Sequence, residues 1–307
     1  MKIEGAIFVL LLILQNSAGC ARSRKPTNDP AEKLREAAYA RVDEAFRKAV
    51  FYKPDENAAT RRFLILAPLI VQAVADAGED KASPSRIAAV EANSSGELSF
   101  NVSRPTIYAD VSTTAIGGRD YEQVVYVWWY PPAKTEASSA VPDNGSSLWR
   151  GYRLTLDREG FPMVWEVLGD QSGLAVIFVS KVLEEAAAKA FGPPLAGRRF
   201  SIERSIESRP NVVVARVLDD GPQPMGPFVY LNAEHQAVTT LICRCMPSQV
   251  HDFVDNLSYE LQPLTKIGAR APDGGAWPDS ASDLPHPHRE MSDPIWLERA
   301  LRWPEGL

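Results

Sequence analysis

Two cysteines and two histidines in the last quarter of the chain have the side chains best suited to metal or redox chemistry. Cys243 and Cys245 are spaced C-x-C, and His251 follows the second cysteine by six residues. Alternate residues of a strand point to the same face, so an extended segment would place both sulfurs side by side. With His235 from the preceding turn, this set of thiolates and imidazoles would suit zinc or copper. We therefore treat these four residues as a candidate metal or redox site.

Two other interpretations of the cysteines stay open. A helix predicted after Cys245 would direct its N-terminal dipole towards that thiol and favour the reactive thiolate. Alternatively, both thiols are simply structural, because cysteine is among the residues most often buried in protein cores. We predict no bound cofactor, with zinc or copper at these residues as the alternative.

Motifs typical of enzymes are absent from the sequence. It contains no G-x-S-x-G, H-E-x-x-H, P-loop or G-x-G-x-x-G pattern. The net charge of −6 argues against a nucleic-acid-binding protein, which usually carries a basic surface. We therefore expect a non-catalytic binding or scaffolding module. The alternative is a thiol- or metal-dependent protein built on Cys243, Cys245 and His251.

The N-terminus has the pattern of an export signal. Lys2 precedes a nine-residue apolar run, Ala6 to Leu14, which is too short to span a bilayer and is typical of a signal peptide. The run is followed by Ser17-Ala18-Gly19-Cys20, and small residues directly before a cysteine resemble the lipobox of bacterial lipoproteins. The resemblance implies that residues 1–19 are removed and that Cys20 carries lipid, such as palmitate. An ordinary signal peptide, which would give a secreted protein, is the alternative.

The same resemblance implies a place in the cell envelope. Ala21, rather than Asp, follows the cysteine. In lipoproteins of cells with two membranes, this favours the outer membrane, on its periplasmic or surface side. Residues 20–29 are polar and would form a short tether between the lipid and the folded part. The resemblance covers only these first residues, and we recognise no family for the mature domain.

Hydrophobic periodicity predicts a single main α+β domain over residues 30–264. Three helices are expected, over about 30–49, 180–191 and 248–261. Alternating or continuously apolar runs between them predict strands. These strands are expected at 98–102, 107–111, 123–130, 152–156, 161–167, 174–179, 200–206, 212–218, 228–231 and 237–245. The expected architecture is a mostly antiparallel sheet with about three flanking helices.

Residues 265–307 are rich in proline and are predicted to be a tail. One short helix is expected within it, over 294–303, because Asp293-Pro294 has the form of a helix cap and Trp296 and Trp303 follow at roughly helical spacing. This helix would either pack back on the domain or dock a protein partner through its two tryptophans.

Overall fold

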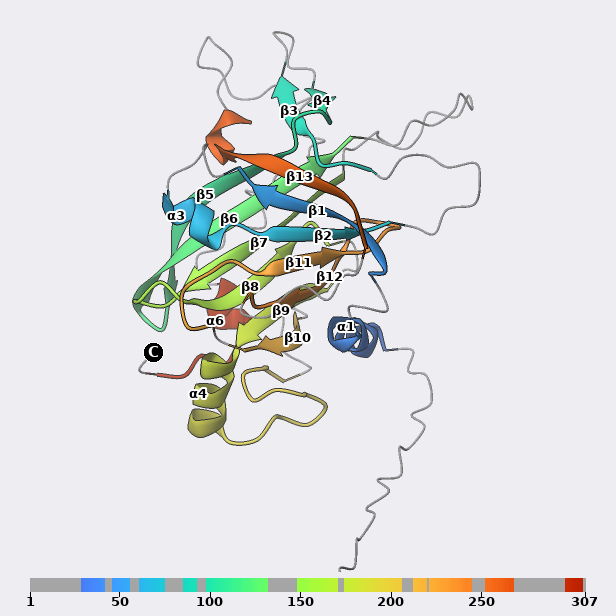
Figure 1. Ribbon diagram of the computed structural model, residues 1–307. Coiled ribbons are helices and arrows are strands. Elements are labelled where there is room, and N and C mark those ends of the chain that lie inside the picture. Colours follow the sequence, from blue (N-terminus) through green and yellow to red (C-terminus); the bar gives the residue numbers. More distant parts are fainter. Residues whose placement is uncertain are drawn as a thin grey trace, which may run out of the picture.

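The computed structural model is mostly β-structure, and the predicted α+β architecture is wrong. Thirteen strands and four α-helices occur in the residues that the structure describes. Eleven of the strands form one mixed sheet (Figure 1). The described residues are 29–41, 46–55, 61–74, 85–92, 98–131, 148–170, 174–205, 212–219, 221–244, 252–267 and 296–305.

The strands of the large sheet, in chain order, are β1 (Lys48–Pro54), β2 (Leu69–Ala73), β5 (Thr106–Ile116), β6 (Arg119–Tyr130), β7 (Leu148–Leu156), β8 (Pro162–Leu168), β9 (Ala175–Ser180), β10 (Val212–Leu218), β11 (Phe228–Leu231), β12 (Val238–Ile242) and β13 (Asp252–Pro263). A separate two-stranded sheet pairs β3 (Ala89–Ala92) with β4 (Leu98–Asn101). The helices are α1 (Pro30–Tyr39), α3 (Arg61–Leu66), α4 (Lys181–Phe191) and α6 (Trp296–Ala300), with one turn of 3-10 helix, η1 (Leu264–Lys266).

The large sheet combines an antiparallel meander with long-range parallel pairings. Its strand order is β10-β9-β8-β7-β6-β5-β13-β1-β2-β11-β12. Strands β5 to β9 follow one another antiparallel, whereas β13 lies parallel to both β5 and β1. The pairs β2–β11 and β9–β10 are also parallel. The sheet is therefore mixed, and in its strand order β13 joins the β5–β10 half to the half that contains β1, β2, β11 and β12.

The helix predicted over 248–261 is instead strand β13. Its apolar positions 253, 257 and 261 recur every four residues, a spacing that fits a helix and also fits a strand with alternating sides. The residues that distinguish the two patterns are Val254, which is 46% exposed, and Tyr259, which is fully buried. Both follow the two-residue period of a strand.

Two further elements differ from those predicted. The first helix ends at Tyr39, because Ala40 has extended backbone angles, and Ala49 belongs to β1. The strand predicted over 200–206 is absent from its described part, 200–205, which forms turns and a single bridge between Glu203 and Leu301. In contrast, α4 begins at the predicted cap, Ser180, and ends at Gly192.

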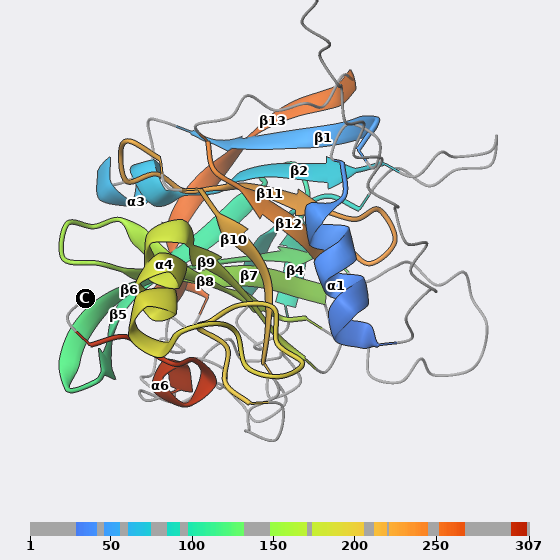
Figure 2. The same cartoon turned by 90° about the horizontal axis from the view of Figure 1, so that it is seen from below.

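The sheet is rolled, and α1 lies along the seam between its two edges (Figure 2). This helix contacts both edge strands, β10 and β12. Arg216 of β10 and Thr240 of β12 both donate to the carbonyl oxygen of Ala38, at 3.0 and 2.8 Å. An uncovered edge strand presents unpaired backbone groups to other chains. The helix therefore covers the two edges and joins them.

The end of the roll that holds the β11–β12 turn is closed by a buried arginine. Arg150, only 2% exposed, donates to the carbonyl oxygens of Gly169 at 2.6 Å, His235 at 2.8 Å and Gln236 at 3.2 Å. These bonds join the β7–β8 side of the roll to the β11–β12 turn on the facing side. They also hold Gln236, whose φ of 49° is in the left-handed region.

The core has an inner part and outer parts. The inside of the roll is filled by large aromatic and aliphatic side chains, among them Tyr126, Trp128 and Phe178. Outside, α4 and α6 cover one cluster of the sheet, and the β3–β4 pair covers a second cluster around Trp129 and Trp149. Both faces of β6 are therefore buried, as its continuously apolar sequence predicts.

Candidate functional site

The other end of the roll is closed by residues 63–68, which we call the plug. Four side chains from inside the roll donate hydrogen bonds to its backbone carbonyl oxygens. The donors and acceptors are Tyr126 to Phe63 (2.9 Å), Tyr152 to Leu66 (3.2 Å), Tyr259 to Pro68 (2.8 Å) and Arg244 to Ala67. Burial raises the pKa of Tyr152 and Tyr259 well above the usual value, so these phenols remain protonated donors.

A second segment clamps the plug from the side of β11. The amide of Gly226 donates to the carbonyl oxygen of Ile65 at 2.9 Å, and that of Leu69 donates to Pro227 at 3.0 Å. The two backbones approach so closely that a Cβ on Gly226 would overlap the carbonyl oxygen of Leu66. The plug is thus fixed on two sides, and it forms a rigid wall for the space beside it.

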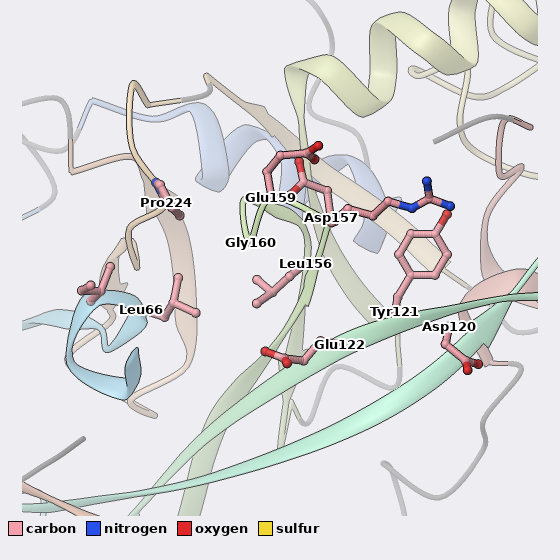
Figure 3. Close-up of a pocket in the computed structure, with 11 residues that line it drawn as sticks. Leu66, Asp120, Tyr121, Glu122, Leu156, Asp157, Glu159, Gly160 and Pro224 are labelled. Carbon is pink, nitrogen blue, oxygen red and sulfur yellow. The ribbon is translucent and has the colours of Figure 1, made fainter. Parts of the chain in front are cut away.

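A pocket of about 460 Å³ lies next to the plug at this end of the roll (Figure 3). The β5–β6 hairpin extends past the end of β7, since residues 119–122 pair with β5 alone. This overhang and the β7–β8 turn form two sides of the pocket, and the plug forms a third. Its apolar surface comes from Leu66, Leu156 and the 42%-exposed Ile65. We call it the end pocket.

The polar lining of the end pocket is acidic. It contains four carboxylates and one guanidinium, from Asp120, Glu122, Asp157, Glu159 and Arg158. In Figure 3, Asp157 and Glu159 lie above Leu156 and Glu122 lies below it, whereas Asp120 lies farther away, beyond Tyr121. A cavity lined by one sign of charge attracts ligands of the opposite sign.

One carboxylate oxygen of Asp157 stabilises the β7–β8 turn. Its Oδ1 accepts from the amide of Phe161 at 2.7 Å, and Gly160 in that turn has a φ of 89°. Glu122 comes from β6, whereas Glu159 is exposed in the β7–β8 turn. The lining contains no serine, cysteine or histidine. It therefore offers shape and charge for binding, and its carboxylates are the groups with the chemistry of an acid, base or nucleophile.

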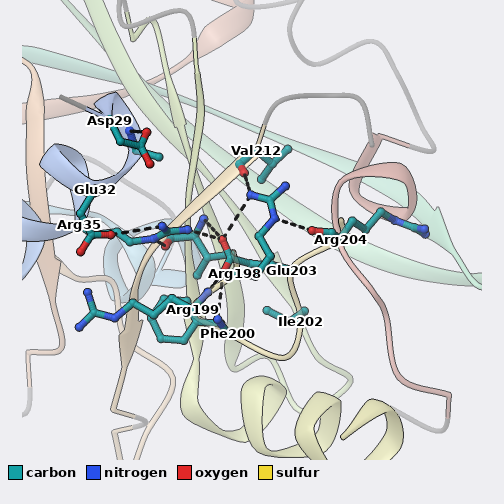
Figure 4. Close-up of polar contacts among 12 residues, drawn as sticks. Asp29, Glu32, Arg35, Arg198, Arg199, Phe200, Ile202, Glu203, Arg204 and Val212 are labelled. Atoms are coloured by element: carbon teal, nitrogen blue, oxygen red, sulfur yellow. Dashed lines mark hydrogen bonds and ion pairs between the residues drawn. The ribbon is translucent and has the colours of Figure 1, made fainter. Parts of the chain in front are cut away.

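A buried carboxylate outside the pocket has a structural role (Figure 4). Glu203 is 2% exposed and accepts from Arg35 at 2.6 Å and from the amides of Arg199 and Phe200, both at 2.9 Å. Arg35 belongs to α1, and it also donates to Val214 of β10 at 3.2 Å. This cluster fastens the seam helix to the sheet. Both carboxylate oxygens of Glu203 already accept hydrogen bonds from the protein itself.

The structure separates two members of the candidate metal site. Cys243 is half-buried directly after β12, close to Gly221 at the plug end of the roll. His235 is exposed in the β11–β12 turn, at the opposite end of the same strand. A five-residue strand is about 16 Å long at ~3.3 Å per residue, so these two side chains do not share a ligand set. Cys245, His251 and Cys20 lie outside the described residues.

Within the part of the chain that the structure describes, no group of three histidine, cysteine or acidic residues is placed to hold a metal ion. No described helix is both long enough and apolar enough to cross a bilayer.

The two tryptophans of the C-terminal segment are half-buried against the outer cluster under α4. Trp303 donates from Nε1 to the hydroxyl of Tyr121 at 3.4 Å, and Tyr121 lines the end pocket.

Sequence reasoning did not find the end pocket. The turn at 157–160 was predictable, but its neighbours Leu66, Glu122 and Pro224 come from distant segments that only the rolled sheet brings together. Comparison with known proteins adds no assignment: no family model, curated protein sequence or solved structure matches the chain. The site must therefore be interpreted from its own geometry.

Proposed function

We propose that this chain is a lipid-anchored cell-envelope protein whose folded part is a non-catalytic binding module. The end pocket would be its binding site, and its ligand a small organic cation with an apolar body. The observation that carries the proposal is the pocket itself, in which an acidic polar lining lies beside apolar side chains.

The ligand class follows from the lining. Leu66, Leu156 and Ile65 provide a surface for an apolar body, and the carboxylates of the lining provide negative charge for a cation. The net negative charge of the lining favours a positive ligand and disfavours a negative one of the same shape. An apolar cation would satisfy both parts of the lining.

Two probes of matched shape and opposite charge test this proposal. Tetraphenylphosphonium is an apolar cation, and tetraphenylborate is its near-isosteric anion. We expect the purified full-length protein to bind the cation measurably in equilibrium dialysis and to bind the borate at least about tenfold more weakly, a difference of ~1.4 kcal/mol. Binding of neither probe would contradict the binding-site proposal, and equal binding of both would contradict the ligand class.

Removing carboxylates from the pocket provides a second test. We expect Glu122→Gln combined with Glu159→Gln to weaken tetraphenylphosphonium binding about fivefold or more, because each lost charge of an exposed pair contributes up to ~1 kcal/mol. The matched control is Glu185→Gln, an exposed glutamate of α4 outside the pocket lining. If the control lowers affinity as much as the pocket variant, the effect is one of overall charge and the assigned site is wrong.

The anchor has its own test in cells. We expect radiolabelled palmitate to enter the protein and to be lost completely in Cys20→Ser, because only that cysteine follows the lipobox-like residues. Cys243→Ser is the matched control and is expected to retain the label. Label that persists after Cys20→Ser would refute the anchor site.

A further inference from the structure

The C-terminal segment 296–305, which we call the strap, is docked on the outside of the sheet. Leu297 and Leu301 are buried in the cluster between α4 and the sheet, at 1% and 0% exposure. The amide of Arg302 donates to Ile202 at 2.7 Å, and Arg204 donates to the carbonyl oxygens of Glu298 at 2.6 Å and Leu301 at 3.0 Å. The strap therefore occupies a defined place, which combines apolar anchors with backbone hydrogen bonds.

The strap contacts the wall of the end pocket. Besides the hydrogen bond from Trp303 to Tyr121, the two rings meet edge to face with centroids 5.3 Å apart. Glu298 accepts from the amide of Gly117 at the tip of the β5–β6 hairpin, at 3.4 Å. The strap thus touches both the tip of the overhanging hairpin and a side chain of the pocket wall.

Tyr121 is shared by two cavities. One is the end pocket, and the other is a pocket of about 390 Å³ that Trp303, Arg119 and Glu305 help to line. The side chain is 5% exposed, and its hydroxyl meets the strap in the second cavity. Tyr121 therefore connects the strap directly to the end pocket.

The strap is built to detach more easily than the sheet. None of its residues belongs to a strand of either sheet, and Leu301 makes one isolated bridge to Glu203, which also lies outside the sheets. Its helix has five residues, fewer than an isolated helix needs for stability. Segments at the chain terminus that lie outside the hydrogen-bonded ladders of a sheet open at lower free energy than core strands.

We propose that docking of the strap regulates the end pocket through Tyr121; this inference rests on the binding function proposed above. With the strap docked, Trp303 holds the Tyr121 ring and Glu298 holds the hairpin tip, so the pocket wall is ordered before a ligand arrives. With the strap released, the ring loses its aromatic neighbour, and the pocket binds a cation more weakly. The two processes are coupled, so ligand binding must in turn favour the docked strap by the same factor.

Amide hydrogen exchange on the unmodified full-length protein tests this coupling. The amide of Arg302 reports strap docking, because its hydrogen bond to Ile202 breaks when the strap leaves. We expect saturating tetraphenylphosphonium to slow exchange at Arg302 about fivefold or more, the lower range of allosteric couplings. If the probe binds but exchange at Arg302 is unchanged, the regulation is wrong and the binding function stands. If the probe does not bind, the binding function itself fails.

Substitutions at the contact provide the reciprocal measurement. We expect Trp303→Ala to raise the dissociation constant of tetraphenylphosphonium about fivefold or more, and Trp303→Phe, which keeps an aromatic edge against Tyr121, to restore at least half of the lost affinity on a logarithmic scale. Both variants retain the acidic lining of the pocket. Unchanged affinity in Trp303→Ala, with faster exchange at Arg302, would overturn the proposal, because the strap would then open without any effect on the pocket.

Discussion

Gly226→Ala is expected to destabilise the protein by about 3 kcal/mol or more, one of the largest effects available to a single methyl group. A Cβ at this position would overlap the carbonyl oxygen of Leu66 and lie 2.5 Å from that of Ala67. Both obstacles are backbone atoms of the plug, which Tyr152 and Arg244 hold from the other side. Since neither segment can retreat without breaking hydrogen bonds, the strain cannot relax locally. Urea unfolding followed by tryptophan fluorescence measures the loss.

Gly221→Ala is the matched control in the same loop. Its added Cβ would come no closer than 3.2 Å to the Sγ of Cys243, a side-chain atom that has some freedom to move. We expect a loss below about 1 kcal/mol for this variant. Equal losses for the two alanines would show that the loop, rather than the contact with the plug, determines the cost.

The second large effect is expected at the seam, where Glu203→Gln is predicted to lower the free energy of unfolding by about 3–5 kcal/mol. The substitution keeps the size of the side chain but removes the closer and more buried of the two carboxylates that pair with Arg35, and Arg198 lies 3.8 Å from the same oxygen. It also weakens the bonds that the carboxylate accepts from two backbone amides. The loss is measured by urea unfolding at neutral pH.

Glu32→Gln provides the control for the same arginine. Glu32 lies 3.6 Å from Arg35 but its side chain is 23% exposed, so solvent screens the pair. We expect a loss of no more than about 1 kcal/mol. If Glu32→Gln and Glu203→Gln lowered the free energy of unfolding equally, the buried carboxylate of Glu203 would not be the residue that fastens α1 to the sheet.

The elements that could be predicted from the sequence are those whose signals lie close together in the chain. The α4 helix has its cap at Ser180 and its end at Gly192, and the β7–β8 hairpin has its turn between two apolar runs. The position of β13 had no such local signal. It pairs Glu260 with Thr106, and contacts so distant in sequence depend on the whole sheet. The four-residue spacing of its apolar side chains also fitted a helix, so the architecture was predicted as α+β.

The end pocket could not be predicted for a related reason. Its carboxylates are ordinary surface residues in their own segments, and Asp157 and Glu159 have the composition of a turn. They become a site only because the β5–β6 hairpin overhangs β7 and the plug crosses the same end of the roll. Conversely, Cys243 and His235 were grouped because they are near each other in the sequence, yet strand β12 extends between them. The two residues are near in sequence, but the strand places their side chains at its opposite ends.

The seam helix also determines how the domain would bear mechanical force. In the anchored protein that we propose, α1 is the first helix after the tether, so tension on the lipid anchor reaches the domain at Pro30. The load then passes through Arg35 and the Ala38 carbonyl into the two edge strands of the roll. Pulling would peel the helix from its seam before it strained the interior strand pairs. The attachment of α1 to β10 and β12, which closes the sheet, is thus also the contact that would break first under tension. Its loss would expose the two edge strands, which could then pair with another chain.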